Sequence, residues 1–361
     1  MIKLERGFIL CLFLSVIISG AAYGQTKVVV RQKSVQKPEK KSEKTHLTPQ
    51  GEFCEGLAKV SIDGSYKYGF INKTGVLIIP CKWRDASHFS EGLAAVEDAN
   101  RKYGYIDKTG KLVILSKWSY ANDFSEGLAC VKDANSKYGY IDKTGKVVIP
   151  CIWKSAWHFH EGLAYVEDDN ERYGFIDKNG KIVIPCKWKK AGSFYEDLAP
   201  VKDEKGRYGF IDKTGTLVIP CKWKDAEVFR EGLAKVQNAN GKYGYIDKTG
   251  QLVIPCKWDW MTRSFSEGLA KVVTDKHDND GFINKTGSLV IHRNWYYVEP
   301  FSGGLARVTG DDKKHGFIDK AGSIIIPCKW KYATDFSEGL ALVLDDNKNL
   351  YIINTKGEII K

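Results

Sequence analysis

The sequence predicts an all-β protein, a tandem array of nine three-stranded antiparallel β-meander repeats of about 35 residues each. Two observations predict this fold. A glycine that follows an aromatic residue in most repeats recurs from Gly69 to Gly316 at a spacing of 35, broken once by a step of 37. A second signature, Glu-Gly-Leu-Ala, precedes each hairpin, with its leucine recurring nine times from Leu57 to Leu340. A fixed period of this length is typical of solenoids, propellers and arrays.

Each repeat contains the signals of three short strands. Polar residues at 107–110 separate the apolar runs 103–106 and 112–114. Gly110 can adopt the positive φ that closes a type I turn with a bulge, so a hairpin is predicted. Upstream, the run 92–96 is joined to the hairpin by residues typical of a turn, which adds a further strand.

The third strand of the repeat carries the most specific expectations. It usually reaches a proline, as at Pro80 and Pro150, and because proline cannot donate to a ladder, we expect the strand to stop there, at the outer edge. Its apolar residues alternate onto both faces, so both faces should be covered. Gly104 should leave a slot opposite Ile114 that a large ring covers, and Trp118 is the candidate.

A single repeat is too small to fold alone. The apolar surface in 35 residues does not offset the conformational entropy of ordering them. The small sheets must therefore stack on their neighbours in sequence. The array begins with a first strand and ends with a third strand, so no sheet shared between the two ends is visible. A propeller-like ring and an open β superhelix both fit this pattern.

Residues 1–24 have the features of a secretory signal. Two basic side chains precede an apolar run from Phe8 to Ile18, and small residues follow up to Gly24. We expect a signal peptide cleaved after Gly24. The alternative is an uncleaved membrane anchor, for which the run is short, since a spanning helix needs ~20 residues.

Charge is concentrated ahead of the repeats. Residues 25–50 are rich in Lys, Ser and Gln and are predicted to be a basic flexible tether. Of the formal net charge of +11, the signal carries +1 and the tether +5, which leaves +5 for the repeat domain at 51–361. Its lysines are spread over the hairpin tips, so we predict no nucleic-acid binding. The tether is expected to make weak contact with an anionic envelope surface.

The nine cysteines of an exported chain suggest disulfides, but their positions argue against most pairings. Six occupy the same slot of different repeats: Cys81, Cys151, Cys186, Cys221, Cys256 and Cys328. Equivalent atoms of stacked sheets lie ~10 Å apart, beyond the ~7 Å reach of a disulfide. We predict free thiols that act as small hydrophobic groups. Cys54 and Cys130 lie outside this slot, and their pairing stays open.

No constellation typical of catalysis is visible. Carboxylates recur in nearly every repeat, which indicates a structural role, and the turn aspartates are expected to cap their own turns. His158 and His160 supply only two metal ligands. No nucleophile elbow, phosphate loop or zinc signature is present. The sequence predicts no catalytic residue, no cofactor and no metal.

The informative variation lies between the third strand of one repeat and the first strand of the next. Trp, Ala and Phe recur there three residues apart, as at Trp83, Ala86 and Phe89, while the residues between them change. Large aromatics occupy several variable positions: Tyr120, Trp157, Trp260, Tyr296, Tyr297 and Tyr332. If exposed on one rim, they would form a strip suited to a protein or glycan partner. The other interpretation is that they fill gaps left by insertions.

The repeat resembles a known family. The sequence Tyr-Gly-Phe-Ile-Asp-Lys-Thr-Gly, followed by Leu-Val-Ile-Pro, a Trp and Phe-Ser-Glu-Gly-Leu-Ala, is similar to the bacterial WG repeat, also called KWG. The resemblance covers residues 53–361, with Asp197 replacing Gly, Gly303 replacing Glu, and a last hairpin at 347–361 that resembles a terminal cap. It implies exported or envelope-associated β-rich proteins with no assigned activity and supplies no catalytic residues.

Together these observations predict an exported bacterial repeat scaffold that binds a protein or glycan at the cell envelope and is not an enzyme. Its location would be periplasmic, cell-surface or secreted. Two other functions stay open. One is a propeller-type hydrolase with an unrecognised site, and the other is a purely structural envelope protein.

Overall fold

The computed structural model describes residues 46–62, 65–259, 263–273, 280–292 and 295–360. All regular elements in these ranges are β-strands. In this part of the chain there is no helix long and apolar enough to cross a membrane. The predicted signal peptide and most of the predicted tether lie outside the described residues. The unit 44–361 is described here by itself.

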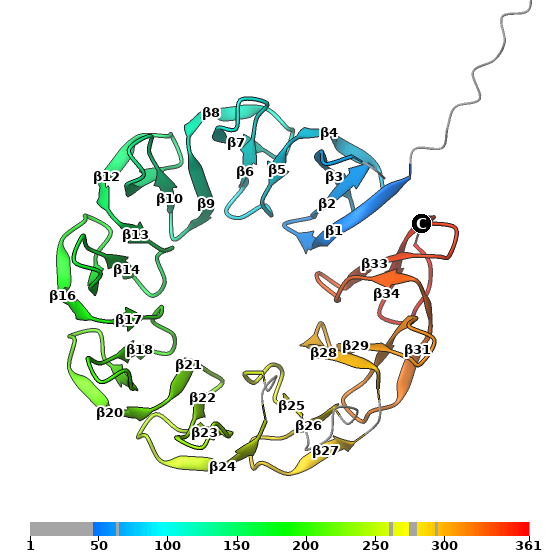
Figure 1. The fold of residues 1–361 in the computed structure, drawn as a ribbon. Coiled ribbons are helices and arrows are strands. Elements are labelled where there is room, and N and C mark those ends of the chain that lie inside the picture. Colours follow the sequence, from blue (N-terminus) through cyan, green and yellow to red (C-terminus); the bar gives the residue numbers. More distant parts are fainter. Residues whose placement is uncertain (1–45, 63–64, 260–262, 274–279, 293–294, 361) are drawn as a thin grey trace, which may run out of the picture. The chain divides into compact units, whose positions relative to one another are not determined.

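The described strands form nine antiparallel sheets, seven with four strands and two with three, each built from consecutive strands. The sheets follow one another around a ring, and this unit is a nine-bladed β-propeller (Figure 1). The predicted all-β tandem array is confirmed. Of the two shapes that the sequence allowed, the structure has the ring.

The first five sheets cover residues 47–223. The first contains β1 (Leu47–Cys54), β2 (Leu57–Ile62), β3 (Tyr68–Asn72) and β4 (Leu77–Trp83). The second contains β5 (Asp85–Ala86), β6 (Leu93–Glu97), β7 (Tyr103–Asp107) and β8 (Leu112–Trp118). The third contains β9 (Tyr120–Ser125), β10 (Leu128–Lys132), β11 (Tyr138–Asp142) and β12 (Val147–Trp153). The fourth contains β13 (Ser155–Ala156), β14 (Ala164–Glu167), β15 (Tyr173–Ile176) and β16 (Ile182–Trp188). The fifth contains β17 (Lys190–Ala191), β18 (Ala199–Lys202), β19 (Tyr208–Ile211) and β20 (Leu217–Trp223).

The other four sheets complete the ring. The sixth contains β21 (Asp225–Arg230), β22 (Leu233–Gln237), β23 (Tyr243–Ile246) and β24 (Leu252–Trp258). The seventh contains β25 (Ala270–Val273), β26 (Asp280–Ile283) and β27 (Leu289–His292). The eighth contains β28 (Tyr297–Ser302), β29 (Leu305–Thr309), β30 (His315–Ile318) and β31 (Ile324–Trp330). The ninth contains β32 (Tyr332–Ala333), β33 (Leu340–Leu344) and β34 (Leu350–Asn354).

The three predicted strands form the core of a sheet, and most sheets gain a fourth strand from the variable link. In the second sheet β5 pairs with β6 through Ala86 and Val96, and it is only two residues long. Strand β1 of the first sheet begins at Leu47, so residues 47–50 belong to this sheet and not to the tether predicted at 25–50.

The expectation that the third strand stops at its proline was wrong. Strand β4 continues through Pro80 to its tryptophan, and the proline lies at a bulge on the outermost strand. In the second sheet Tyr105 pairs with Ile114 and Tyr103 with Trp118, so residues 115–117 lie opposite a single glycine.

That bulge explains the glycine of the repeat. A Cβ on Gly104 would lie 2.4 Å from the carbonyl oxygen of Ile114 and 2.8 Å from the nitrogen of Ser116. No side chain fits at such distances. The backbone of β8 therefore fills the predicted slot, and the ring of Trp118 packs instead in the core between the second and third sheets.

The outer strand is covered on one face only, which corrects the expectation that both faces are covered. In β8, Ile114 is buried, whereas Val113 is 40% exposed. The two residues before the buried isoleucine are exposed in most other outer strands, for example Leu77 and Ile78 in β4. These strands lie along the outside of the ring (Figure 1), so its circumference carries repeated aliphatic side chains.

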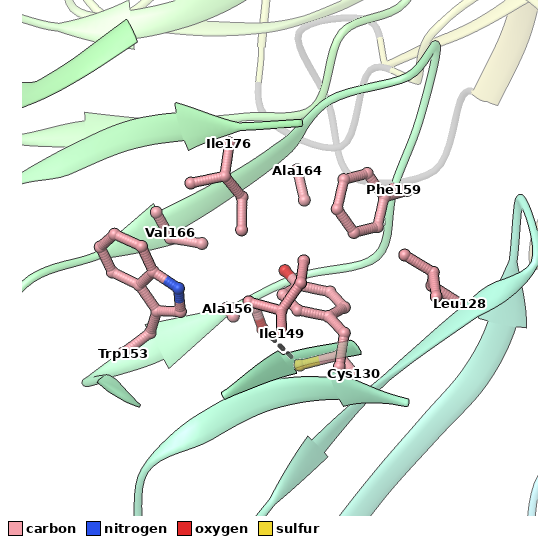
Figure 2. Close-up of a cluster of buried hydrophobic side chains, with 10 residues drawn as sticks. Leu128, Cys130, Ile149, Trp153, Ala156, Phe159, Ala164, Val166 and Ile176 are labelled. Atoms are coloured by element: carbon pink, nitrogen blue, oxygen red, sulfur yellow. Dashed lines mark hydrogen bonds between the residues drawn. The ribbon is translucent and has the colours of Figure 1, made fainter. Parts of the chain in front are cut away.

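The apolar cores lie between sheets. Figure 2 shows the core shared by the third and fourth sheets, where Ile149 and Trp153 of one sheet meet Ala156 and Phe159 of the next. Each of the other apolar clusters also combines residues of two neighbouring sheets, including the cluster of the first and ninth sheets. Burial of apolar surface is the dominant favourable term in folding, so each sheet depends on its neighbours.

A repeated polar contact, which we call the Glu clasp, joins neighbouring sheets. Glu91 of the second sheet accepts a hydrogen bond from the backbone N–H of Gly127 at 3.0 Å and pairs with Lys143 Nζ at 3.0 Å, both in the third sheet. Within the described residues the clasp carboxylates are Glu55, Glu91, Glu126, Glu161, Glu196, Glu231, Glu267 and Glu338.

The same contact closes the ring. Glu338 of the ninth sheet accepts a hydrogen bond from Gly56 N–H at 3.1 Å and pairs with Lys73 Nζ at 2.8 Å, both in the first sheet. The Ser337 hydroxyl donates to the carbonyl oxygen of Phe53 at 2.6 Å. The ring thus closes without a sheet shared between the two ends. Between the eighth and ninth sheets Gly303 takes the place of the clasp glutamate.

Ring closure can be tested with Glu338→Gln, using Glu91→Gln as the matched control. Both side chains are 30% exposed and make the same contacts. Loss of charge should weaken each clasp by about 1 kcal/mol, because hydrogen bonds to charged groups are the stronger ones. We expect equal decreases in melting temperature, measured by calorimetry. If only Glu91→Gln lowers the melting temperature, the ring is open in solution.

Candidate functional site

The repeated carboxylates are held by structural contacts. Burial raises the pKa of Glu91, but hydrogen bonds from Lys143 and from the Gly127 N–H outweigh this, and its pKa lies below the usual value. For Glu338 the hydrogen bond from Lys73 is the largest cause of a lowered pKa. A carboxylate that stays ionised and bonded in this way suits a joint between sheets better than proton transfer.

The turn aspartates cap their own turns, as predicted. Asp107 Oδ1 accepts hydrogen bonds from the Thr109 hydroxyl at 2.6 Å, from its backbone N–H at 2.9 Å and from the Lys111 N–H at 3.1 Å. The hydrogen bond from the threonine hydroxyl is the largest cause of a lowered pKa for Asp107. Equivalent bonds recur at Asp142 and Asp212.

The thiols are poor candidates for nucleophiles. Burial raises the pKa of Cys151 and of Cys186 to about 11, so both thiols are protonated at neutral pH. The prediction of free thiols is confirmed for Cys81, Cys151, Cys186, Cys221 and Cys256. Cys54 and Cys130 lie on β1 and β10 and form no disulfide with each other.

The two histidines of the fourth sheet do not act as a pair. His158 is exposed, whereas the ring of His160 stacks on Tyr195 with centroids 3.7 Å apart. The guanidinium of Arg230 lies 4.8 Å from the centroid of the Tyr195 ring, so His160, Tyr195 and Arg230 form a row. Within the described ranges no three His, Cys, Asp or Glu side chains gather where they could hold a metal ion.

This row of His160, Tyr195 and Arg230 was missed at the level of sequence. In five other repeats this position is a serine that donates to the next sheet, as Ser90 does to the Phe124 carbonyl at 2.8 Å, and in the first repeat it is Cys54. Three successive repeats replace that serine with large side chains that contact one another. The sequence signal that could have revealed this row is the replacement of the serine in three consecutive repeats.

The predicted aromatic strip falls into separate groups. Tyr296 is 65% exposed, Tyr120 39% and Tyr332 37%, while Trp157 and Tyr297 are half-buried. Trp260 lies outside the described residues. The five described residues belong to the third and fourth sheets and to the eighth and ninth, together with the link that precedes β28.

Most of these residues contact aromatics of neighbouring positions. Tyr120 lies 5.8 Å from Tyr103 and 6.4 Å from Tyr138, between ring centroids. Trp157 is stacked on Tyr165 at 4.4 Å. The contact of Tyr120 with Tyr103 joins the third sheet to the second, so the aromatic surface continues from one sheet to the next. The contact with Tyr165 holds Trp157 against its own sheet.

A comparison with protein-family models identifies the repeat. The model described as "WG containing repeat" matches at 68–101, 103–138, 138–171, 173–206, 208–243, 243–276, 281–313 and 316–348. The chain belongs to the WG-repeat family. The resemblance seen in the sequence is thereby confirmed. No curated protein matches the chain.

Solved structures similar to this WG-repeat ring are distant in sequence. The computationally designed Ika8 protein is 12% identical, with a TM-score of 0.45 over 74% of this chain and 95% of that chain. BamB from Moraxella catarrhalis is 11% identical, with a TM-score of 0.42 over 74% and 92%. The dihydro-heme d1 dehydrogenase NirN is 13% identical, with a TM-score of 0.49 over 90% and 84%. These similarities carry no argument about function.

The clasp carboxylates make stability depend on pH. The pKa values of Glu55, Glu91, Glu161 and Glu338 are lowered in the folded WG-repeat ring. Their contribution is therefore complete above the unfolded pKa of about 4.3 and is lost as pH falls through the folded values. We expect a constant melting temperature from about pH 7 to 5.5 and a decrease below about pH 4.5. Glu91→Gln/Glu338→Gln should reduce that decrease, and an unchanged profile would contradict this role.

Exposure also separates the candidate aromatics by their effect on folding. Tyr296→Ala should change the free energy of unfolding by less than about 0.5 kcal/mol, because the side chain is mostly in solvent. Trp157→Ala should cost about 2 kcal/mol, because it removes a stacked and half-buried ring. Thermal denaturation followed by circular dichroism measures both. Equal losses would place Tyr296 in the packed structure.

Proposed function

We propose that this WG-repeat protein is an exported bacterial scaffold that binds a protein or glycan partner at the cell envelope and catalyses no reaction. The observation that carries the proposal is the exposure of Tyr120, Tyr296 and Tyr332 at positions that vary between repeats. Aromatic side chains are enriched in binding surfaces, because they bury a large apolar area and retain a polar group.

The arrangement of the ionisable groups supports a binding role over a hydrolase. The recurring glutamates join sheets and the recurring aspartates cap turns, so both sets have structural partners. The row of His160, Tyr195 and Arg230 is unrepeated, but its rings cover one another. A hydrolase needs an acid, base or nucleophile that faces a substrate.

The N-terminal sequence supports export. Residues 1–24 have the order of a signal peptide, and residues 25–46 supply a basic segment that precedes the first strand in the sequence. In this proposal the protein is periplasmic, on the cell surface or secreted, and the basic segment contacts an anionic envelope surface weakly.

The proposal is tested by capture of partners on the immobilised protein. Envelope proteins and purified peptidoglycan fragments are applied to the wild type and to Tyr120→Ala/Tyr296→Ala/Tyr332→Ala. The triple variant should retain at least about tenfold less partner, since aromatic hot spots each contribute more than about 1 kcal/mol. Tyr66→Ala is the matched control, because Tyr66 is 89% exposed and lies outside the set.

The three functions give different results in this experiment. A protein or glycan retained by the wild type and lost by the triple variant supports the scaffold. A wild type that retains neither supports a purely structural envelope protein. Turnover of a glycan, ester or peptide substrate by the wild type supports the hydrolase.

A further inference from the structure

Two outer strands, β8 and β27, lack the proline that protects the others. The fourth residue of β4, β12, β16, β20, β24 and β31 is proline: Pro80, Pro150, Pro185, Pro220, Pro255 and Pro327. In β8 this residue is Leu115. Proline on an edge strand has no N–H to offer and blocks pairing with another chain. Strand β8 has lost that protection.

The geometry of the bulge shows where the freed N–H points. The carbonyl oxygen of Ile114 and the nitrogen of Ser116 both face Gly104, since a Cβ there would meet them first. In a planar trans peptide C=O and N–H point in opposite directions. The N–H and C=O of Leu115 therefore point away from β7, to the open side of the outermost strand.

The side chains around this backbone form an apolar centre with basic ends. Leu115 is 73% exposed and Val113 40% exposed. Lys111 and Lys117, on either side, are also exposed. In the adjacent sheet, Ile152 of β12 replaces the lysine of the repeat and is 58% exposed. Two departures from the repeat thus place exposed aliphatic side chains on β8 and β12. These two strands are neighbours on the outside of the ring (Figure 1).

We propose that β8 is the docking edge for an extended segment of a protein partner, which adds a strand to the second sheet. The inference rests on the proposed scaffold function, and it specifies the conformation of the partner segment and the strand to which that segment binds. The partner segment carries aliphatic residues between two acidic ones. Acidic side chains pair across the strands with Lys111 and Lys117, and aliphatic ones cover Val113 and Leu115.

Charge argues against a second copy of this chain as the occupant. In the register centred on Ile114, antiparallel pairing of β8 with itself brings Lys111 of one copy opposite Lys117 of the other, and like charges directly opposite are unfavourable. The seventh sheet is a poorer edge, because β27 has His292, not an aliphatic residue, at the proline position.

The test uses a synthetic peptide, acetyl-Glu-Thr-Val-Thr-Val-Thr-Glu-amide, labelled with a fluorophore. Leu115→Pro restores the residue that six other outer strands carry, so the sheet should tolerate it. Binding is followed by fluorescence anisotropy. We expect Leu115→Pro to weaken binding about tenfold, the effect of losing a backbone hydrogen bond and its ladder contact.

Two controls follow from the repeat. A peptide with lysine in place of both glutamates should bind wild type more weakly. Pro185→Leu in β16, where Lys181 and Lys187 take the flanking positions, should create a second site and raise the stoichiometry to two. Equal binding by wild type and Leu115→Pro, or no preference for the acidic peptide, would overturn the proposal.

The outcomes also separate this inference from the scaffold function. The triple tyrosine variant should still bind the acidic peptide, because its changes lie off β8. If envelope partners are captured equally by wild type and Leu115→Pro, the scaffold stands and the β8 site falls. If sedimentation shows a dimer of the wild type that Leu115→Pro dissociates, β8 pairs with itself and the partner proposal is wrong.

Discussion

Every apolar core in this ring is shared by two sheets, and the rest of the structure depends on that constraint. A sheet of three or four short strands has too little surface to form a core alone. Its Trp and Ile therefore pack on the Ala and Phe of the next inner strand, as Trp153 and Ile149 do on Ala156 and Phe159. The repeat period of the sequence is the number of residues between one such joint and the next.

The Glu clasp adds direction to this packing. The clasp glutamate is held at positive φ, as at Glu91 with 53°, and its carboxylate reaches the turn and the hairpin tip of the next sheet. Apolar contact alone would allow neighbouring sheets to slide, whereas a bidentate acceptor between an N–H and an ammonium group fixes their register. The closing joint at Glu338 uses the same groups, so its polar contacts do not differ from those of the other clasped joints.

The sequence was sufficient for the repeat, its strands and the free thiols, because period, turn residues and equivalent positions are local properties. The sequence was not sufficient to predict that β8 continues past Ile114 through a bulge. A proline at this position in other repeats indicates a strand end as well as a bulge, and only the pairing of Tyr103 with Trp118 distinguishes them. Ring closure was also hidden, because the partners of Glu338 lie about as far away along the chain as the repeat domain allows.

The candidate site shows a related limit. Variable aromatics such as Tyr120 and Trp157 look equivalent in the sequence, but their exposure depends on whether Tyr165 or an open surface lies beside them. The row of His160, Tyr195 and Arg230 requires three neighbouring sheets before its members meet. The roles of residues that recur in every repeat could be predicted more reliably than the roles of residues that vary between repeats.

The uniform joint has a consequence for how such rings change over time. Because most consecutive sheets meet through the same core positions and the same carboxylate, recombination that removes or duplicates one whole repeat among them leaves the remaining joints with the same contacts. The joint between the eighth and ninth sheets differs, since Gly303 takes the place of the clasp glutamate there. A duplication in phase would therefore add a whole blade, whereas a duplication out of phase would separate Glu from its Lys and Gly and leave a core half filled.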